Sequence, residues 1–313
     1  MKGLELARRY YEYCGKQMLD TQFPGLREKI AVGLTGSGSQ CYGFDDEISQ
    51  DHDFEPGFCL FLPDESIVSE STAFQLEKAY NKLPKEFMGY KRSLLSPVGG
   101  NRVGVFRARQ YFEEKIGTSN GILSYYQWLT LPEYALLEAV NGEIFEDESD
   151  VVTTLRKRLS DFPEDIRKKK LAGYLVLMNQ AGQYNYARTL ERNDSGAAQL
   201  CISEFVNATI HAVYLLNNRY TPYYKWQFAG LRQLEILPVV AEFAEYLLNS
   251  GNSDEEAEIK KGMIDTIASL VADELCRQKL SDTESTDLEK QAQAVNKKIT
   301  DGDIRNLNIL IGV

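Results

Sequence analysis

The chain has 313 residues, and its 46 acidic side chains outnumber its 35 basic ones, which gives a formal net charge of −11. This excess argues against a general nucleic-acid coat, because such a protein neutralises phosphates with Lys and Arg. Hydrophobic residues make up 43% and charged residues 26% of the chain, which excludes a wholly disordered protein and predicts a soluble one.

The first part of the chain mixes strand and helix patterns. Helical spacing of apolar residues predicts a helix in residues 4–18, and short apolar runs predict buried strands at 30–34, 58–62 and 101–106. Two further helices are expected at 71–83, with Ser71 or Thr72 as the cap, and at 109–116, with Gly117 as the stop signal. This alternation indicates a small α+β domain, which we place at residues 1–120.

From about Ser124 onward the pattern is helical. Apolar residues recur every three to four positions, and short polar connections separate the segments. The expected helices are 132–140, 151–159, 163–181, 195–216, 222–234, 238–248, 253–280 and 285–299. We therefore expect residues 121–313 to form an antiparallel helical bundle.

Several classes of protein are disfavoured by what the sequence contains. No apolar run approaches the ~20 residues of a membrane span, and charges interrupt residues 1–19, so we expect neither a membrane anchor nor a signal peptide. Five widely spaced cysteines without a C-x-x-C pair indicate free thiols and a cytoplasmic protein. Only His52 and His211 could serve a histidine-based mechanism, and neither has a nucleophile motif around it.

The informative stretch is GLTGSGSQCYGFDDEISQDHDF, which starts at Gly33. Gly36 and Ser37 follow a predicted strand, where backbone N–H groups could meet a phosphate. Asp51 and Asp53 are two residues apart, so in an extended segment they lie on one face. Two carboxylates on one face need a cation between them, and Mg²⁺ suits oxygen ligands that it shares with phosphates.

A Gly-Ser turn followed by Asp-x-Asp resembles the signature of the polymerase-β-like nucleotidyltransferase superfamily. Together with LLNNRYTPYYKW at 215–226, the stretch is similar to a bacterial nucleotidyltransferase-like branch of unknown function. The similarity extends to about Leu234. It implies a mixed β-sheet domain that binds a nucleoside triphosphate, with ATP as the expected donor, and a helical domain behind it.

The resemblance assigns roles by position. Gly36 and Ser37 would contact the triphosphate, and Asp51 and Asp53 would be catalytic and hold Mg²⁺ or Mn²⁺. Lys225, at a predicted helix start beside Tyr224, would reach the phosphates; the alternative is a lysine that snorkels past core aromatics.

The superfamily usually adds a third carboxylate on a later strand, and Gly104 stands where it would be expected. Candidates for the missing acid are Asp45, Asp46 and Glu47 in the loop before Asp51.

Two further clusters are open to more than one interpretation. Tyr184, Asn185 and Arg188 lie at neighbouring helical positions and could line an acceptor pocket with Tyr224, or could be a packing seam. Arg167 and Lys168–Lys170 could form a basic patch, although an exposed helix face is the expected interpretation.

The resulting hypothesis is a Mg²⁺-dependent nucleotidyltransferase that moves a nucleoside monophosphate, expected to be AMP, to a hydroxyl of a small molecule. Long nucleic acids are not the expected acceptor, because the chain is acidic overall. The alternative is a non-catalytic nucleotide-binding or regulatory module on the same fold. The oligomeric state does not follow from the sequence.

Overall fold

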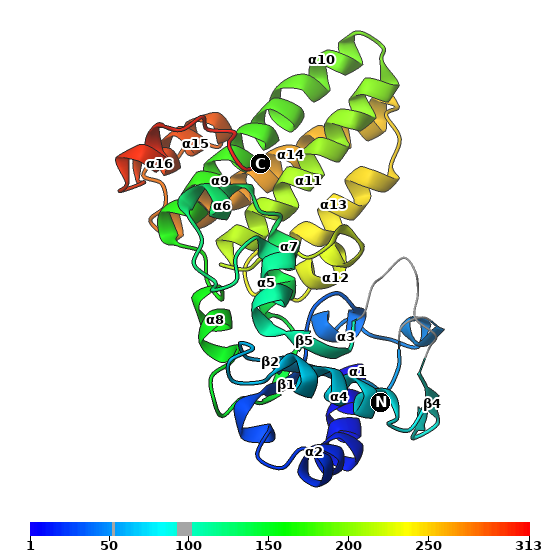
Figure 1. Cartoon of the computed structure of the whole chain (residues 1–313). Helices are drawn as coiled ribbons and strands as arrows, with labels where there is room; N and C mark the ends of the chain where they lie inside the picture. Colours follow the sequence, from blue (N-terminus) through cyan, green and yellow to red (C-terminus); the bar gives the residue numbers. More distant parts are fainter. Residues whose placement is uncertain (52–53, 93–101) are drawn as a thin grey trace. The chain divides into compact units, whose positions relative to one another are not determined.

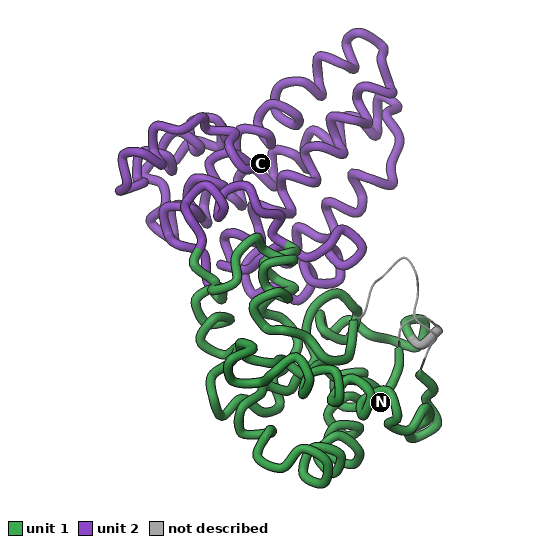
Figure 2. The backbone as a smooth tube through the Cα atoms, in the orientation of Figure 1, with its two compact units in different colours: residues 1–122, 134–160 green, residues 123–133, 161–313 purple. Residues whose placement is uncertain are grey.

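A computed structural model describes residues 1–51, 54–92 and 102–313, and the chain divides into two compact units (Figure 2). Unit 1 comprises Met1–Ile122 and Tyr134–Ser160, and unit 2 comprises Leu123–Glu133 and Asp161–Val313. Unit 1 therefore ends near the expected boundary but also includes Tyr134–Ser160, which the helical pattern had assigned to the bundle.

Unit 1 is built on a four-stranded mixed sheet with the order β5-β2-β1-β6 (Figure 1). The central strands β1 (Ala31–Leu34) and β2 (Cys59–Leu62) are antiparallel and fully buried. The edge strands are β5 (Gly104–Arg107), parallel to β2, and β6 (Glu143–Glu146), antiparallel to β1. The three expected strands are confirmed, with β5 starting later than predicted; β6 was not predicted.

The apolar side chains of the strands alternate between the two faces of the sheet, and helices of unit 1 pack on them. Tyr10, Tyr11 and Leu19 pack with Val32 and Leu60 in the main core. Tyr10 comes from α1 (Gly3–Tyr10), Tyr11 from the π-helical turn Tyr11–Gly15, and Leu19 from α2 (Lys16–Gln22). Further elements of this unit are α3 (Ser39–Tyr42), α4 (Glu70–Asn81), the hairpin of β3 (Glu86–Phe87) and β4 (Tyr90–Lys91), α5 (Ala108–Ile116), α7 (Glu133–Val140), whose first residue belongs to unit 2, and α8 (Thr153–Arg158).

The helix ends of unit 1 follow local capping chemistry, with one correction. Helix α5 ends at Gly117, which adopts a left-handed conformation as expected. Helix α4 is capped by Ser69, whose side chain accepts a hydrogen bond from the N–H of Thr72 at 3.2 Å. The predicted caps, Ser71 and Thr72, were wrong because the helix begins one residue before Ser71.

Unit 2 is helical (Figure 1). Its long helix α11 (Ser195–Leu216) matches the predicted range and packs against α9 (Glu164–Met178). A π-helical stretch at Asn179–Asn185 continues α9 into α10. The remaining helices are α6 (Tyr125–Thr130), α10 (Tyr186–Glu191), α12 (Gln227–Leu231), α13 (Val240–Asn249), α14 (Asp254–Arg277), α15 (Leu288–Lys297) and α16 (Gly302–Asn306).

Candidate functional site

The turn after β1 is held by a side chain from a distant part of unit 1. Gly36 has a φ of +109°, a conformation that L-amino acids with a side chain rarely adopt. Its N–H donates to the Asn141 Oδ1 at 2.9 Å, and its carbonyl accepts from the Asn141 Nδ2 at 2.9 Å. The N–H of Gly36 is therefore engaged by Asn141, and the amides that follow are the ones available to a ligand.

Those following amides are unpaired within the described residues. The N–H groups of residues 37–40 donate to no acceptor in the part of the chain that the structure describes, and neither does the Ser37 hydroxyl. A run of successive N–H groups in a turn attracts anions. Ser37 is half-buried and remains the candidate for a phosphate contact.

A lysine that the sequence analysis did not single out lies beside this turn. A Cβ built on Gly36 would be 3.4 Å from the Lys115 Nζ and 2.9 Å from the Tyr111 hydroxyl. The Lys115 ammonium pairs with the Glu138 Oε2 at 3.2 Å, and its side chain is 21% exposed. The only sequence signal for Lys115 is its i, i+4 spacing from Tyr111 on α5, which is common on helices.

Glu138 and Tyr111 hold this cluster in place. The Tyr42 hydroxyl donates to the Glu138 Oε1 at 2.9 Å, so both carboxylate oxygens of Glu138 have a partner. The Tyr111 hydroxyl donates to the Thr35 carbonyl at 3.3 Å, and burial raises the pKa of Tyr111 well above its usual value. Tyr111 therefore stays neutral, and Lys115 is the cation nearest the turn among these groups.

The loop carboxylates have different structural roles. The Gly3 N–H donates to the buried Asp45 carboxylate at 2.8 Å, so Asp45 anchors the start of α1 and is not available as a base. Asp46 is exposed and accepts hydrogen bonds from the N–H and hydroxyl of Ser49, both at 2.9 Å, which lower the pKa of Asp46. Asp46 is consequently ionised at neutral pH and can offer oxygen ligands to a cation. Glu47 is exposed.

The aspartate pair lies at a border of the described chain. Asp51 is the last residue of a short 3-10 helix, Ile48–Asp51, whereas the sequence suggested an extended segment. Asp53 lies outside the described residues. Among the residues that are described, no group of three or more His, Cys, Asp or Glu side chains could hold a metal ion.

The position expected for a third acid has a backbone that favours glycine. Gly104, the first residue of β5, has a φ of +132°. A Cβ would have open space around it, so the obstacle is the backbone conformation and not crowding. The backbone conformation therefore accounts for the glycine at this position.

We predict that Gly104→Ala destabilises unit 1 by about 1–2 kcal/mol, the usual cost of a non-glycine residue in a left-handed conformation. Chemical denaturation followed by tyrosine fluorescence and far-UV circular dichroism measures the change, because Trp128 and Trp226 both belong to unit 2. The control Gly262→Ala lies in helix α14 at a glycine with open space around it and is expected to stabilise. If Gly104→Ala left the stability of unit 1 unchanged, β5 would tolerate an acid at this position without strain.

Lys225 and Tyr224 belong to unit 2 and are exposed. They lie in a 3-10 turn, Tyr224–Trp226, followed by the five-residue helix α12, so the predicted continuous helix at 222–234 was wrong. The Lys225 Nζ lies 5.0 Å from the centroid of the Trp226 ring, a cation–π contact. Lys225 has no ion pair with any residue that the structure describes.

The proposed acceptor residues are only partly brought together. Tyr184 and Arg188 are exposed and contact each other, with the Arg188 guanidinium 4.7 Å from the Tyr184 ring centroid. Asn185 instead lines a groove of about 520 Å³ between α11 and the π-helical stretch at the end of α9, with Gln180 and Asn207. Neither Tyr184, Arg188 nor Tyr224 lines that groove.

The structure corrects the interpretation of the basic residues 167–170 in α9. Lys169 and Lys170 are buried, so this segment is neither a basic patch nor an exposed helix face. The Lys169 Nζ donates to the Leu307 carbonyl at 2.7 Å and to the Arg305 carbonyl at 3.1 Å. The Lys170 Nζ donates to the Gly312 carbonyl at 2.7 Å, so main-chain oxygens replace water around both ammonium groups.

A buried acid of unit 2 lies next to Lys170. The Glu133 Oε1 is 3.7 Å from the Lys170 Nζ, and its Oε2 is 3.6 Å from the His211 Nδ1 and accepts from the Thr221 N–H at 3.0 Å. Burial alone raises the pKa of Glu133, but the attraction of His211 and Lys170 outweighs burial and lowers the pKa to about 2. His211 stacks on Tyr174 with ring centroids 4.6 Å apart.

Comparison with known proteins finds a family model, of unknown function, that matches part of the chain. The model described as "Domain of unknown function (DUF4037)" matches residues 128–227, a range that includes Glu133, Lys170, His211 and Lys225. No curated protein and no solved structure matches the chain. In the described part of the chain, no helix combines the length and apolar character needed to cross a membrane.

Proposed function

We propose that this protein is a nucleotidyltransferase that moves a nucleoside monophosphate, with ATP as the expected donor, to a hydroxyl of a small acceptor. The observation that carries the proposal is the turn after β1. There, the unpaired amides of residues 37–40 follow Gly36, and the Lys115 ammonium lies beside it. Amides in a turn and a half-buried cation suit a triphosphate, whose charge needs both.

The metal expected from the resemblance fits the donor chemistry of the loop. Mg²⁺ or Mn²⁺ takes carboxylate oxygens, and Asp51 and Asp53 would hold it, with Asp46 as a further ionised carboxylate in the same loop. When bound, the ion supplies charge neutralisation to the phosphates. Lys115 adds positive charge at the turn, and the amide and hydroxyl of Ser37 orient a phosphate oxygen.

The chemistry is an in-line displacement at the α-phosphorus. The acceptor hydroxyl oxygen forms a bond to phosphorus, the bond to the pyrophosphate oxygen breaks, and the hydroxyl proton passes to a base. Glu47 suits that role better than Asp46, because hydrogen bonds from Ser49 already lower the pKa of Asp46.

A second candidate is a nucleotide-binding module without catalysis. The observation in its favour is the φ of +132° at Gly104, which makes an acid at this position strained. Such a module would use the same turn to sense a nucleotide, and its output would be a change in stability or partner binding.

One experiment distinguishes these candidates. The protein is incubated with each α-labelled NTP and Mg²⁺, with a panel of small polyols and nucleosides as acceptors, and pyrophosphate release is followed beside a thermal shift. The transferase predicts both a shift and pyrophosphate; at a hundredfold excess over Kd the stabilisation is about 2.7 kcal/mol. A shift without pyrophosphate over the whole panel would favour the module. If no NTP gave a shift, both candidates would fail.

A further inference from the structure

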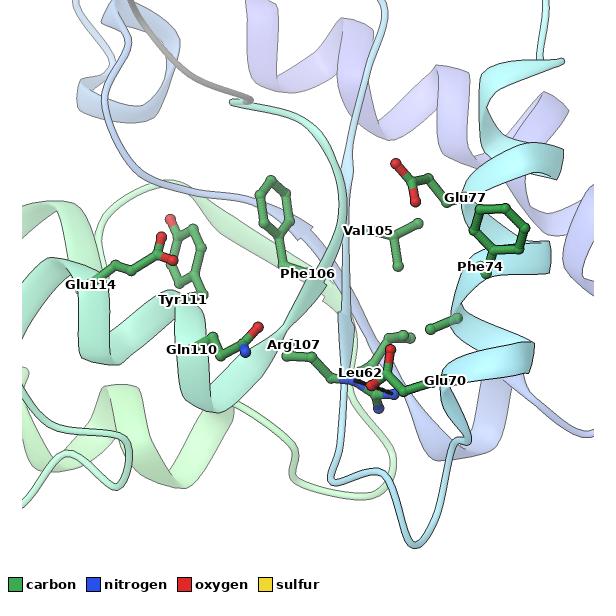
Figure 3. Close-up of a pocket in the computed structure, with 11 residues that line it drawn as sticks. Leu62, Glu70, Phe74, Glu77, Val105, Phe106, Arg107, Gln110, Tyr111 and Glu114 are labelled. Carbon is green, nitrogen blue, oxygen red and sulfur yellow. Dashed lines mark hydrogen bonds and ion pairs between the residues drawn. The ribbon is translucent and has the colours of Figure 1, made fainter.

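The outer edge of β5 opens into a groove. Among residues 1–51, 54–92 and 102–313, β5 is the last strand of the sheet order, and all four of its residues are half-buried, unlike those of the central strands. A cavity of about 280 Å³ follows this edge between α4 and α5. Figure 3 shows Phe106 and Tyr111 on one side of the strand, and Val105 and Phe74 on the other.

The main chain of β5 has hydrogen-bonding groups that face away from the sheet. The Gly104 N–H donates to the Phe58 carbonyl at 3.0 Å, which directs the backbone groups of Gly104 toward β2. Successive residues of a strand alternate, so the N–H and carbonyl of Val105 point outward. An edge of this kind is a template for another strand.

The opposite edge of the sheet is protected by charged side chains. On β6, Glu143 pairs with Arg8, and Glu146 pairs with Lys16 at 2.7 Å. Paired charges along an edge strand discourage the addition of another chain. Beside the β5 edge lies Phe74, which is 57% exposed and offers an apolar contact.

The charge of the groove indicates what would occupy it. Three carboxylates line the groove, those of Glu70, Glu77 and Glu114. One guanidinium, that of Arg107, also lines it, and it is paired with Glu70 at 2.6 Å. Glu77 and Glu114 are exposed and have no ion pair with any described residue. They come from α4 and α5, on opposite sides of β5 (Figure 3).

We infer that the β5 edge binds an extended, basic peptide segment of a partner protein, which adds a strand to the sheet. Main-chain hydrogen bonds to Val105 provide affinity, as in other cases of strand addition. Two Lys or Arg residues that are an odd number of positions apart point to opposite faces of the added strand. One of them therefore meets Glu77 and the other meets Glu114. An apolar side chain between them packs on Phe74.

The test uses the full chain and the fluorescein-labelled peptide Val-Lys-Lys-Val-Val-Lys-Lys-Val, with binding followed by fluorescence anisotropy. A second peptide of the same sequence has methyl groups on the backbone nitrogens of alternate residues. It has the same charge, but one edge of its strand has lost its N–H donors and cannot pair with β5. We expect its binding to be at least about tenfold weaker. Equal affinity of the two peptides would show that only charge attracts them and would overturn the inference.

A protein variant tests the location independently. Glu77→Gln with Glu114→Gln is expected to weaken binding of the unmodified peptide about three- to tenfold, since each exposed pair contributes modestly. Glu65→Gln with Glu113→Gln removes the same charge at exposed residues that do not line the groove, and should leave affinity within about twofold. Equal losses in the two variants would place the peptide elsewhere and refute the proposed edge.

Discussion

Replacing Asp51 and Asp53 together by asparagine is expected to reduce nucleotidyl transfer by about a thousandfold or more, if the proposed function holds. Asparagine keeps the size of each side chain but removes the negative charge that would hold Mg²⁺ beside the triphosphate. Pyrophosphate release at saturating Mg²⁺ and NTP measures the loss. Isothermal titration with Mg²⁺ in the presence of a non-hydrolysable NTP measures the accompanying loss of metal binding.

The matched control is Asp265→Asn with Asp273→Asn. Both aspartates are exposed on α14 in unit 2, so this variant has the same change in net charge as the first. We expect it to keep full activity and full Mg²⁺ affinity. If the Asp51 and Asp53 variant retained both Mg²⁺ and NTP binding, the assignment of the metal site would be wrong, whichever of the two functions the protein has.

The strands and long helices could be predicted because their signals are local. The apolar run at 58–62 lies between Pro-Gly and Pro-Asp pairs, and it becomes the fully buried strand β2. Helix α11 matches its predicted range because apolar spacing is sustained over its 22 residues and Asp194 caps it. Strand β6 was missed because its two glutamates look like a surface turn, while their partners Arg8 and Lys16 lie more than a hundred residues away.

The surroundings of the candidate site could not be predicted, because they depend on contacts distant in sequence. Asn141 lies 105 positions from Gly36, and Glu138 lies 23 positions from Lys115. The local pattern of Lys169 likewise suggests an exposed face, and the carbonyls of Arg305 and Leu307, 136 and 138 positions away, explain its burial. Spacing along one chain reveals the turn and the Asp-x-Asp pair, but not which side chains hold them.

Glu133→Gln is expected to destabilise unit 2 by about 3 kcal/mol, because it leaves the buried Lys170 ammonium without its counter-charge. Chemical denaturation at pH 7 measures the change. Glu242→Gln, at an exposed position on α13, should change stability by less than about 0.5 kcal/mol. Adding Lys170→Met to Glu133→Gln removes the unpaired charge and should recover part of the loss.

The pH dependence of this difference identifies its electrostatic origin. The pKa of Glu133 is lowered from 4.5 to about 2 in the folded chain. A lowered pKa contributes stability that is present above the unfolded value and is lost as pH falls. The gap between the wild type and Glu133→Gln should therefore shrink as pH falls from 4.5 toward 2. A gap that did not change over this range would mean that glutamine acts through packing and that the carboxylate charge of Glu133 is not what holds Lys170.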